Sequence, residues 1–72
     1  MSNYILKIHK DGEIKYCSAI IGFPVTLEFI GSFDHEQPYR FASEFEAWEY
    51  WRLYQQYRPA DATDWTAKVV KL

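Results

Sequence analysis

One segment of this 72-residue chain has the start, the periodicity and the stop of a single α-helix. Ser43 and Glu46 form an S-x-x-E capping box, in which the serine oxygen accepts a backbone N–H three residues on and the glutamate reaches back. Pro59 cannot continue a helix, so we expect the helix to end at about residue 57 or 58. One helix of this length can cover only one face of a sheet.

The remaining regular segments have the pattern of strands. Residues 4–9 and 14–21 alternate around Asp11-Gly12, a dipeptide typical of two-residue hairpin turns. Residues 25–30 and 65–72 predict two more strands, and residues 33–39 and 59–64 predict loops. We therefore predict one α+β domain over residues 1–72, in the order β-β-β-α-β, with a small antiparallel sheet and the helix packed on one face.

Alternation along the first two strands predicts which residues face the helix. The expected helix-facing set is Tyr4, Leu6, Ile8, Ile14, Tyr16 and Ile20, which leaves Ile5, Lys7, His9, Lys15, Cys17 and Ile21 on the uncovered face. Lys68 of the last strand joins the uncovered face in one register. That face, basic with scattered apolar groups, is either solvated sheet or a docking surface. A register that turned Tyr4 and Tyr16 outward would favour nucleic-acid binding.

The aromatic residues of the helix fall into two groups. At about 100° per residue, one arc is expected to lie on the sheet and carries Ala47, Tyr50, Trp51, Tyr54 and Tyr57. Phe45 and Trp48 fall outside this arc, toward the polar side. Either the segment 31–42 folds over these two rings, or they form an exposed aromatic anchor for a partner. A cation–π contact with Arg52, four residues on, can cover part of Trp48.

Charge is unevenly distributed along the chain. From Glu28 to Glu49, both included, the chain has six acidic residues and one arginine, whereas the lysines lie in the first hairpin and the last strand. We expect an acidic patch near the helix start and a more basic sheet, an asymmetry that can steer a charged partner. The formal net charge of −2 argues against a dedicated duplex-DNA binder and is too small for a DNA mimic.

The sequence offers little for catalysis or for a cofactor. The adjacent side chains of Asp34, His35 and Glu36 cannot easily converge on one metal ion. His9 is the other histidine. Cys17 could act as a nucleophile only with a base beside it, and nothing in the sequence places His9 within hydrogen-bonding reach of Cys17. The three glycines form no phosphate-binding loop. We expect no enzyme, no metal and no cofactor.

Cysteine content and hydropathy bear on the compartment. A lone Cys17 can form no internal disulfide, which fits a reducing cytoplasm. The longest apolar run, residues 19–21, is far too short to span a bilayer, and the N-terminus has no signal-peptide core. We expect a cytoplasmic protein with no membrane partner.

These observations favour a non-enzymatic protein-interaction module. In size and general character the chain resembles the small inhibitor and accessory proteins that bacteriophages encode, although no motif identifies a family. In the expected mechanism Phe45 and Trp48, beside Arg52, enter a partner's pocket. The surrounding carboxylates meet basic residues of that partner, and these are Asp34, Glu36, Glu44, Glu46 and Glu49. If the partner handles nucleic acids, the carboxylates compete with phosphate for its lysines and arginines.

The alternative is single-stranded nucleic-acid binding on the uncovered sheet face. Its expected contact residues are Lys7, His9, Lys15 and Lys68. Bases would stack on exposed rings within a basic surface. Because this face is predicted to carry few rings and the chain is slightly acidic, a protein partner is favoured. Pairing of two copies as a homodimer, through an open sheet face or an edge strand, is compatible with either class.

Overall fold

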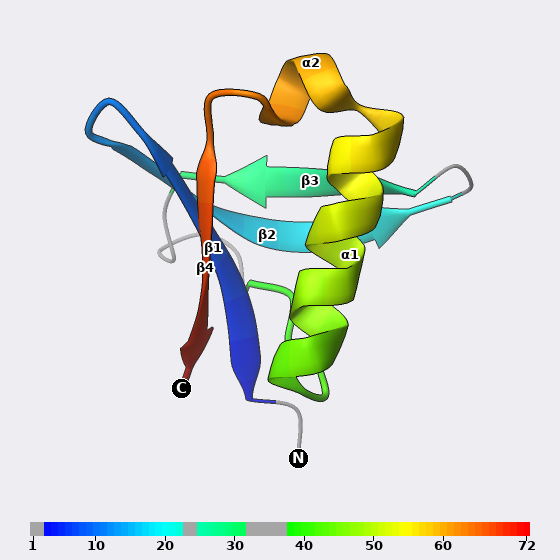
Figure 1. Cartoon of the computed structure of the whole chain (residues 1–72). Coiled ribbons are helices and arrows are strands. Elements are labelled where there is room, and N and C mark those ends of the chain that lie inside the picture. Colours follow the sequence, from blue (N-terminus) through cyan, green and yellow to red (C-terminus); the bar gives the residue numbers. More distant parts are fainter. Residues whose placement is uncertain (1–2, 23–24, 32–37) are drawn as a thin grey trace.

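The computed structural model describes residues 3–22, 25–31 and 38–72 and has the predicted order of elements (Figure 1). Four antiparallel strands form one sheet in the order β3-β2-β1-β4. They are β1 (Tyr4–Lys10), β2 (Glu13–Ile21), β3 (Thr26–Ile30) and β4 (Thr66–Lys71). Helix α1 (Glu44–Tyr57) packs on one face of this sheet. The α+β fold class predicted from the sequence is confirmed.

A short second helix replaces the loop that the sequence predicts after α1. Helix α2 spans Pro59–Ala62, and Pro59 lies in its first turn. Proline is favoured at the start of a helix, where its missing N–H would have no partner in any case. The same residue therefore ends α1 and begins α2. Ala62, at the end of α2, is buried against the core.

The β1–β2 hairpin has the predicted two-residue turn. Asp11 and Gly12 have φ of 50° and 85°, as a type I′ turn requires, and Lys10 pairs with Glu13. This turn sets the pairing of the whole hairpin, so that Lys7 lies opposite Tyr16 and His9 lies opposite Ile14. Even-numbered residues of β1 therefore share a face with odd-numbered residues of β2.

This register corrects the predicted faces of β2. Ile14 and Tyr16 lie on the face away from α1, with Lys7 and His9, whereas the sequence placed them under the helix. Lys15 and Cys17 lie on the helix side, and Cys17 is fully buried in the core. Alternation within each strand is not enough to assign faces, because the number of turn residues decides which positions of two strands share a side.

A β-bulge then changes the alternation within β2. The pairing with β3 shifts between Cys17 and Ala19, which leaves Ser18 as the extra residue. Beyond the bulge Ile20 lies opposite Leu27 and packs on the core, as predicted for Ile20. The bulge thus allows Cys17 and Ile20 to face the same side although three positions separate them.

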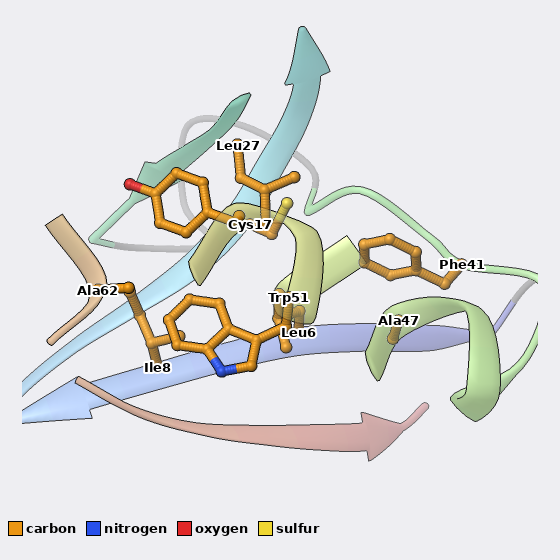
Figure 2. Close-up of a cluster of buried hydrophobic side chains, with 9 residues drawn as sticks. Leu6, Ile8, Cys17, Leu27, Phe41, Ala47, Trp51 and Ala62 are labelled. Atoms are coloured by element: carbon orange, nitrogen blue, oxygen red, sulfur yellow. The ribbon is translucent and has the colours of Figure 1, made fainter. Parts of the chain in front are cut away.

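The core lies between α1 and the sheet (Figure 2). Its buried members are Leu6, Ile8, Cys17, Leu27, Phe41, Ala47, Trp51, Tyr54 and Ala62. Phe29 of β3 meets Trp51 and Tyr54 edge-on, with ring centroids 6.3 and 5.6 Å apart. The predicted helix arc is confirmed at Ala47, Trp51 and Tyr54. Tyr57, predicted on the same arc, is 41% exposed.

Phe41 closes the gap where β2 leaves β1. Their pairing ends at Lys7 and Tyr16, and the chain before α1 enters the gap. Phe41 N–H donates to the Tyr4 carbonyl at 2.8 Å, and Tyr39 N–H donates to the Cys17 carbonyl at 2.8 Å. The Phe41 ring is fully buried. Of the predicted polar loop 33–39, residues 33–37 lie outside the described residues.

Candidate functional site

The N-terminal cap of α1 holds the candidate site in place. Ser43 Oγ accepts a hydrogen bond from Glu46 N–H at 3.1 Å, as predicted. Glu46 Oε1 accepts a hydrogen bond from the Ala42 N–H at 3.1 Å. In a standard capping box the donor would be the N–H of the next residue, Ser43. Two donors at the helix start are therefore satisfied by side chains. Phe45 and Trp48 project from a helix start that is fixed by its own cap.

The two rings outside the helix arc are exposed. Phe45 is 74% exposed and Trp48 is 39% exposed. Within the described residues, Phe45 has the largest exposed fraction among the large apolar side chains. Full burial of such a ring would stabilise the fold by about 1.5–3 kcal/mol. Because the Phe45 ring is exposed, the fold does not gain most of this stabilisation. We keep the name aromatic anchor for Phe45 and Trp48.

A shallow pocket lies beside Phe45. Its volume is about 480 Å³, within the range of roughly 300–1,000 Å³ common for ligand sites. Half-buried apolar side chains of Val25, Tyr50 and Leu53 line it with Phe45, and Ser43, Glu46 and Glu49 complete the lining. We call it the anchor pocket. Sequence reasoning missed Val25, which lies just before β3, because only the fold brings that segment to the helix.

The charged residues around the anchor are partly bound to each other. Arg52 donates to both carboxylate oxygens of Glu49, from Nε at 3.3 Å and from Nη2 at 3.1 Å. These hydrogen bonds hold the pKa of the Glu49 carboxyl below its ordinary value. Among the described residues, Arg52 makes its contacts with Glu49, and the cation–π contact predicted with Trp48 is not formed.

The predicted acidic patch is only partly described. Asp34 and Glu36 lie outside the described residues. Glu46 serves the helix cap and lines the anchor pocket, and Glu44 is exposed in the first turn. The structure therefore brings three of the five predicted carboxylates, with Arg52, to the neighbourhood of the aromatic anchor.

The alternative site on the sheet is also partly assembled. Lys7, His9 and Lys68 share the face away from α1, since Lys7 lies opposite Lys68 and His9 lies opposite Thr66. We call this the outer sheet face, and its exposed or half-buried residues include Lys7, His9, Ile14, Tyr16, Glu28, Thr66 and Lys68. Tyr4 packs on the core, so only one of the two tyrosines is turned outward. Ile5, at the other end of this face, is buried.

Lys15 does not belong to the outer sheet face, which corrects the prediction. It lies on the helix side, where its Nζ is 5.5 Å from the centre of the Trp65 ring and Lys10 Nζ is 5.2 Å from the same centre. A pocket of about 230 Å³ adjoins it, lined by Ile8, Lys15, Phe29, Tyr54, Asp61 and Trp65. Glu13 lies 3.7 Å from the Lys15 ammonium and offsets part of its charge. Lys10 and Lys15 both contact the Trp65 ring, so this cluster can be explained by a structural role.

Cys17, the nucleophile weighed from the sequence, lies in the core and away from His9. Cys17 is fully buried, and burial raises the pKa of its thiol to about 12, so that no thiolate is present near neutral pH. Cys17 and His9 lie on opposite faces of the sheet. No group of three or more His, Cys, Asp or Glu residues in the described ranges could hold a metal ion. The Asp34-His35-Glu36 segment lies outside those ranges.

Comparison with known proteins adds no assignment. Across residues 3–22, 25–31 and 38–72, the structure has no helix with the length and apolar character needed to cross a membrane. No family model, no curated protein and no solved structure matches this chain. The interpretation of the site therefore depends on its own geometry and chemistry.

Proposed function

We propose that this chain is a non-enzymatic protein-interaction module that binds its partner through the outer face of α1. The observation that carries this proposal is the aromatic anchor, with Phe45 74% exposed on a capped helix beside an apolar pocket. Aromatic side chains dominate the energetics of protein interfaces because each removes a large rigid area from water on binding. A rigid helix also loses little conformational freedom when it binds.

The surface indicates the chemistry of the partner. An apolar side chain of the partner would fill the anchor pocket, and Phe45 and Trp48 would enter a pocket in return. Glu46 in the pocket lining and Glu44 in the first turn of α1 favour lysine or arginine next to that apolar side chain. Glu49 can exchange Arg52 for such a residue, because the ion pair lies on the surface, where pairs are weak.

The proposed mechanism is steric, as in a small inhibitor or accessory protein. Occupying a partner's surface would exclude whatever that surface otherwise binds. If the partner handles nucleic acids, the carboxylates of α1 would compete with phosphate for its cations. We place this activity in the cytoplasm, because a single buried thiol fits a reducing compartment.

The test compares wild type with Phe45→Ala, Trp48→Ala and their combination. Thr66→Ala is the control, since Thr66 is exposed on the sheet face away from α1. A partner would be captured from a nuclease-treated lysate of the source cells, purified, and its Kd measured by calorimetry. We expect Phe45→Ala to raise Kd about 30-fold or more, as for an interface hot spot, and Thr66→Ala to leave Kd unchanged.

A charge variant tests the rim separately. Glu44→Lys should slow association and reduce its dependence on salt, while the dissociation rate stays close to that of wild type. The proposal fails if the captured protein binds the Phe45→Ala/Trp48→Ala variant as tightly as it binds wild type. It also fails if every captured protein is lost on nuclease treatment, because nucleic acid would then be the true ligand.

A further inference from the structure

Strand β4 forms an accessible edge of the sheet. In the strand order β3-β2-β1-β4, the described strands leave β4 with a neighbour on one side (Figure 1). Every residue of β4 is exposed or half-buried, whereas β1, β2 and β3 each contain a buried residue. An edge strand presents a row of backbone N–H and C=O groups that can pair with another chain. Of the two edges of this sheet, β4 is therefore the more accessible to a partner.

The backbone of β4 bonds to β1 at every second residue. Leu72 N–H donates to the Asn3 carbonyl at 2.7 Å, which fixes the phase of the ladder. Hydrogen-bonded and non-hydrogen-bonded pairs alternate between antiparallel strands. The β4 residues that bond to β1 therefore lie an even number of positions before Leu72, and they are Thr66, Lys68 and Val70.

The other three residues of β4 direct their N–H and C=O groups to the edge, and they are Ala67, Val69 and Lys71. Tyr4, the partner of Lys71, bonds in the opposite direction, to the carbonyl and the N–H of Phe41. Within the described part of the chain, no backbone group bonds to Ala67, Val69 or Lys71 from beyond this edge. At a rise of about 3.3 Å per residue, the three positions span roughly 13 Å.

The charge at this edge is positive. Strands β1 and β4 are fully described and together carry four lysines and no acidic residue. Lys68 is exposed on the outer sheet face, directly opposite Lys7. Like charges opposite each other destabilise a strand pair, whereas an opposite charge on a neighbouring strand stabilises it. A carboxylate on a strand added beside β4 would therefore offset the repulsion between these lysines.

The helix side of the same edge is apolar. Ala67 and Val69 lie opposite Ile8 and Leu6, and both are half-buried against the core. An added strand would extend this face with side chains placed beside Ala67 and Val69. Because side chains alternate between the two faces of a strand, the matching segment has apolar residues at every second position and carboxylates between them.

We propose that the edge of β4 binds an extended segment of a partner protein in which acidic and apolar residues alternate. The segment pairs with β4 through the backbone groups of Ala67, Val69 and Lys71. Its carboxylates lie beside Lys68, and its apolar side chains continue the core side of the sheet. Main-chain hydrogen bonds supply affinity in this mode of recognition, and the alternate side chains supply specificity.

A second copy of this chain fits the edge less well. Two β4 strands that pair antiparallel about Val69 place Lys68 of one copy diagonally across from Lys68 of the other, about 7–8 Å away. Lysines on edge strands discourage pairing between like chains in this way. The same lysines attract an acidic segment, so charge selects the partner segment over the second copy.

This inference goes beyond the function proposed for α1 and can fail separately from it. The anchor pocket is lined by α1 and by Val25, which comes just before β3 at the opposite edge of the sheet from β4. A chain that loses binding at β4 would keep the Phe45-dependent partner. A chain that loses the Phe45-dependent partner would still bind the acidic segment.

The experiment is a nuclear magnetic resonance titration of the isotope-labelled full chain. The probe is a short peptide, blocked at both ends, in which glutamate and valine alternate. We expect amide shift changes centred on Ala67, Val69 and Lys71, whose amide hydrogens exchange rapidly in the free chain and slowly with the peptide. The amides of Lys68 and Val70 bond to β1 and should be protected with or without it.

Two matched peptides separate strand pairing from charge attraction. The first has lysine in place of glutamate and should bind about tenfold more weakly or less, since like charges then meet. The second keeps every side chain but carries methyl groups on the backbone nitrogens of every second residue. It cannot donate along one of its edges, and the loss of several hydrogen bonds should also weaken binding by about tenfold or more.

Variants of the chain test the same edge. Ala67→Pro places the ring at an N–H that the ladder does not use, so the sheet should form while the added strand is blocked. Lys68→Gln should weaken binding about two- to fivefold. Lys15→Gln is its control, because it removes the same charge from β2, two strands away from β4. We expect Lys15→Gln to leave binding unchanged, and thermal unfolding verifies that each variant is folded.

Four results would overturn the inference. The first is no change in the amides of Ala67, Val69 and Lys71 on addition of the acidic peptide. The second is equal binding of the methylated peptide, which would show that no strand is added. The third is an equal loss in Lys68→Gln and Lys15→Gln, which would show attraction without a site. The fourth is a dimer of the free chain that Ala67→Pro dissociates, which would assign the edge to a second copy.

Discussion

Phe41 and Phe45 carry the same side chain four residues apart, yet the structure places one in the core and the other in water. Phe41 is 0% exposed, and its ring lies 4.8 Å from Tyr39 and 5.9 Å from Tyr50, measured between ring centroids. Removal of a buried phenylalanine side chain costs about 3–5 kcal/mol, because transfer energy is lost and a cavity remains. Since the variant also removes the packing of Phe41 on both tyrosine rings, we expect Phe41→Ala to destabilise the fold by about 4 kcal/mol.

That loss is large for a chain of 72 residues. Stability of about 0.05–0.15 kcal/mol per residue predicts a total of roughly 4–11 kcal/mol. The unfolding entropy typical of this size converts 4 kcal/mol into a fall in Tm of about 25 °C. Phe45→Ala, the matched variant, removes a ring that is 74% exposed and should change stability by less than about 0.5 kcal/mol.

Urea unfolding followed by far-ultraviolet circular dichroism measures both variants against wild type. Thermal unfolding in the same buffer gives the change in Tm. If Phe45→Ala destabilises the chain as much as Phe41→Ala does, the Phe45 ring is buried in solution and the aromatic anchor is refuted. If Phe41→Ala costs less than about 1.5 kcal/mol, the segment before α1 does not close the gap between β1 and β2.

Three further perturbations follow from the local geometry. Burial raises the pKa of Cys17 from 9.0 to about 12, so the unfolded thiol loses its proton first as pH rises. The free energy of unfolding should therefore fall by about 1.4 kcal/mol per pH unit between these values, and Cys17→Ala should remove this component in urea unfolding at several pH values. Ser43→Ala should cost about 1 kcal/mol in thermal unfolding, whereas Ser43→Asp, which also caps, should cost much less. Gly12→Ala should cost about 1–2 kcal/mol because Gly12 has φ of +85°, while Gly31→Ala, with no atom within 4 Å of the added methyl group, should be nearly neutral in the same assay.

Local signals in the sequence predicted the elements and part of the candidate site. Asp11-Gly12, Ser43 and Pro59 act on the backbone within a few residues of themselves, so the turn, the helix start and the helix end could be predicted without the fold. Helical periodicity likewise placed Phe45 and Trp48 outside the buried arc. Their exposure could not be predicted, because it depends on where the segment before α1 runs. That segment directs Phe41 into the core and leaves the next turn open.

Assembly of the candidate surfaces was decided by tertiary structure. The anchor pocket combines Val25 with residues of α1 that follow it by some twenty to thirty positions. The outer sheet face depends on the pairing of Lys7 with Lys68 across β1 and β4. Contacts between residues so distant in the chain leave no local pattern that a sequence could show.

The faces of β2 show this division most clearly. Its alternating residues predict a strand, and the two-residue turn before it is also visible in the sequence. The turn sets Lys15 and Cys17 under the helix, and the extra residue at Ser18 then returns Ile20 to the same side. A bulge forms where packing on both sides of it is better than regular pairing, and the packing partners Leu27 and Trp51 come later in the chain. The sequence by itself determined that β2 is a strand, and only the assembled core decided which of its side chains meet the helix and which meet solvent.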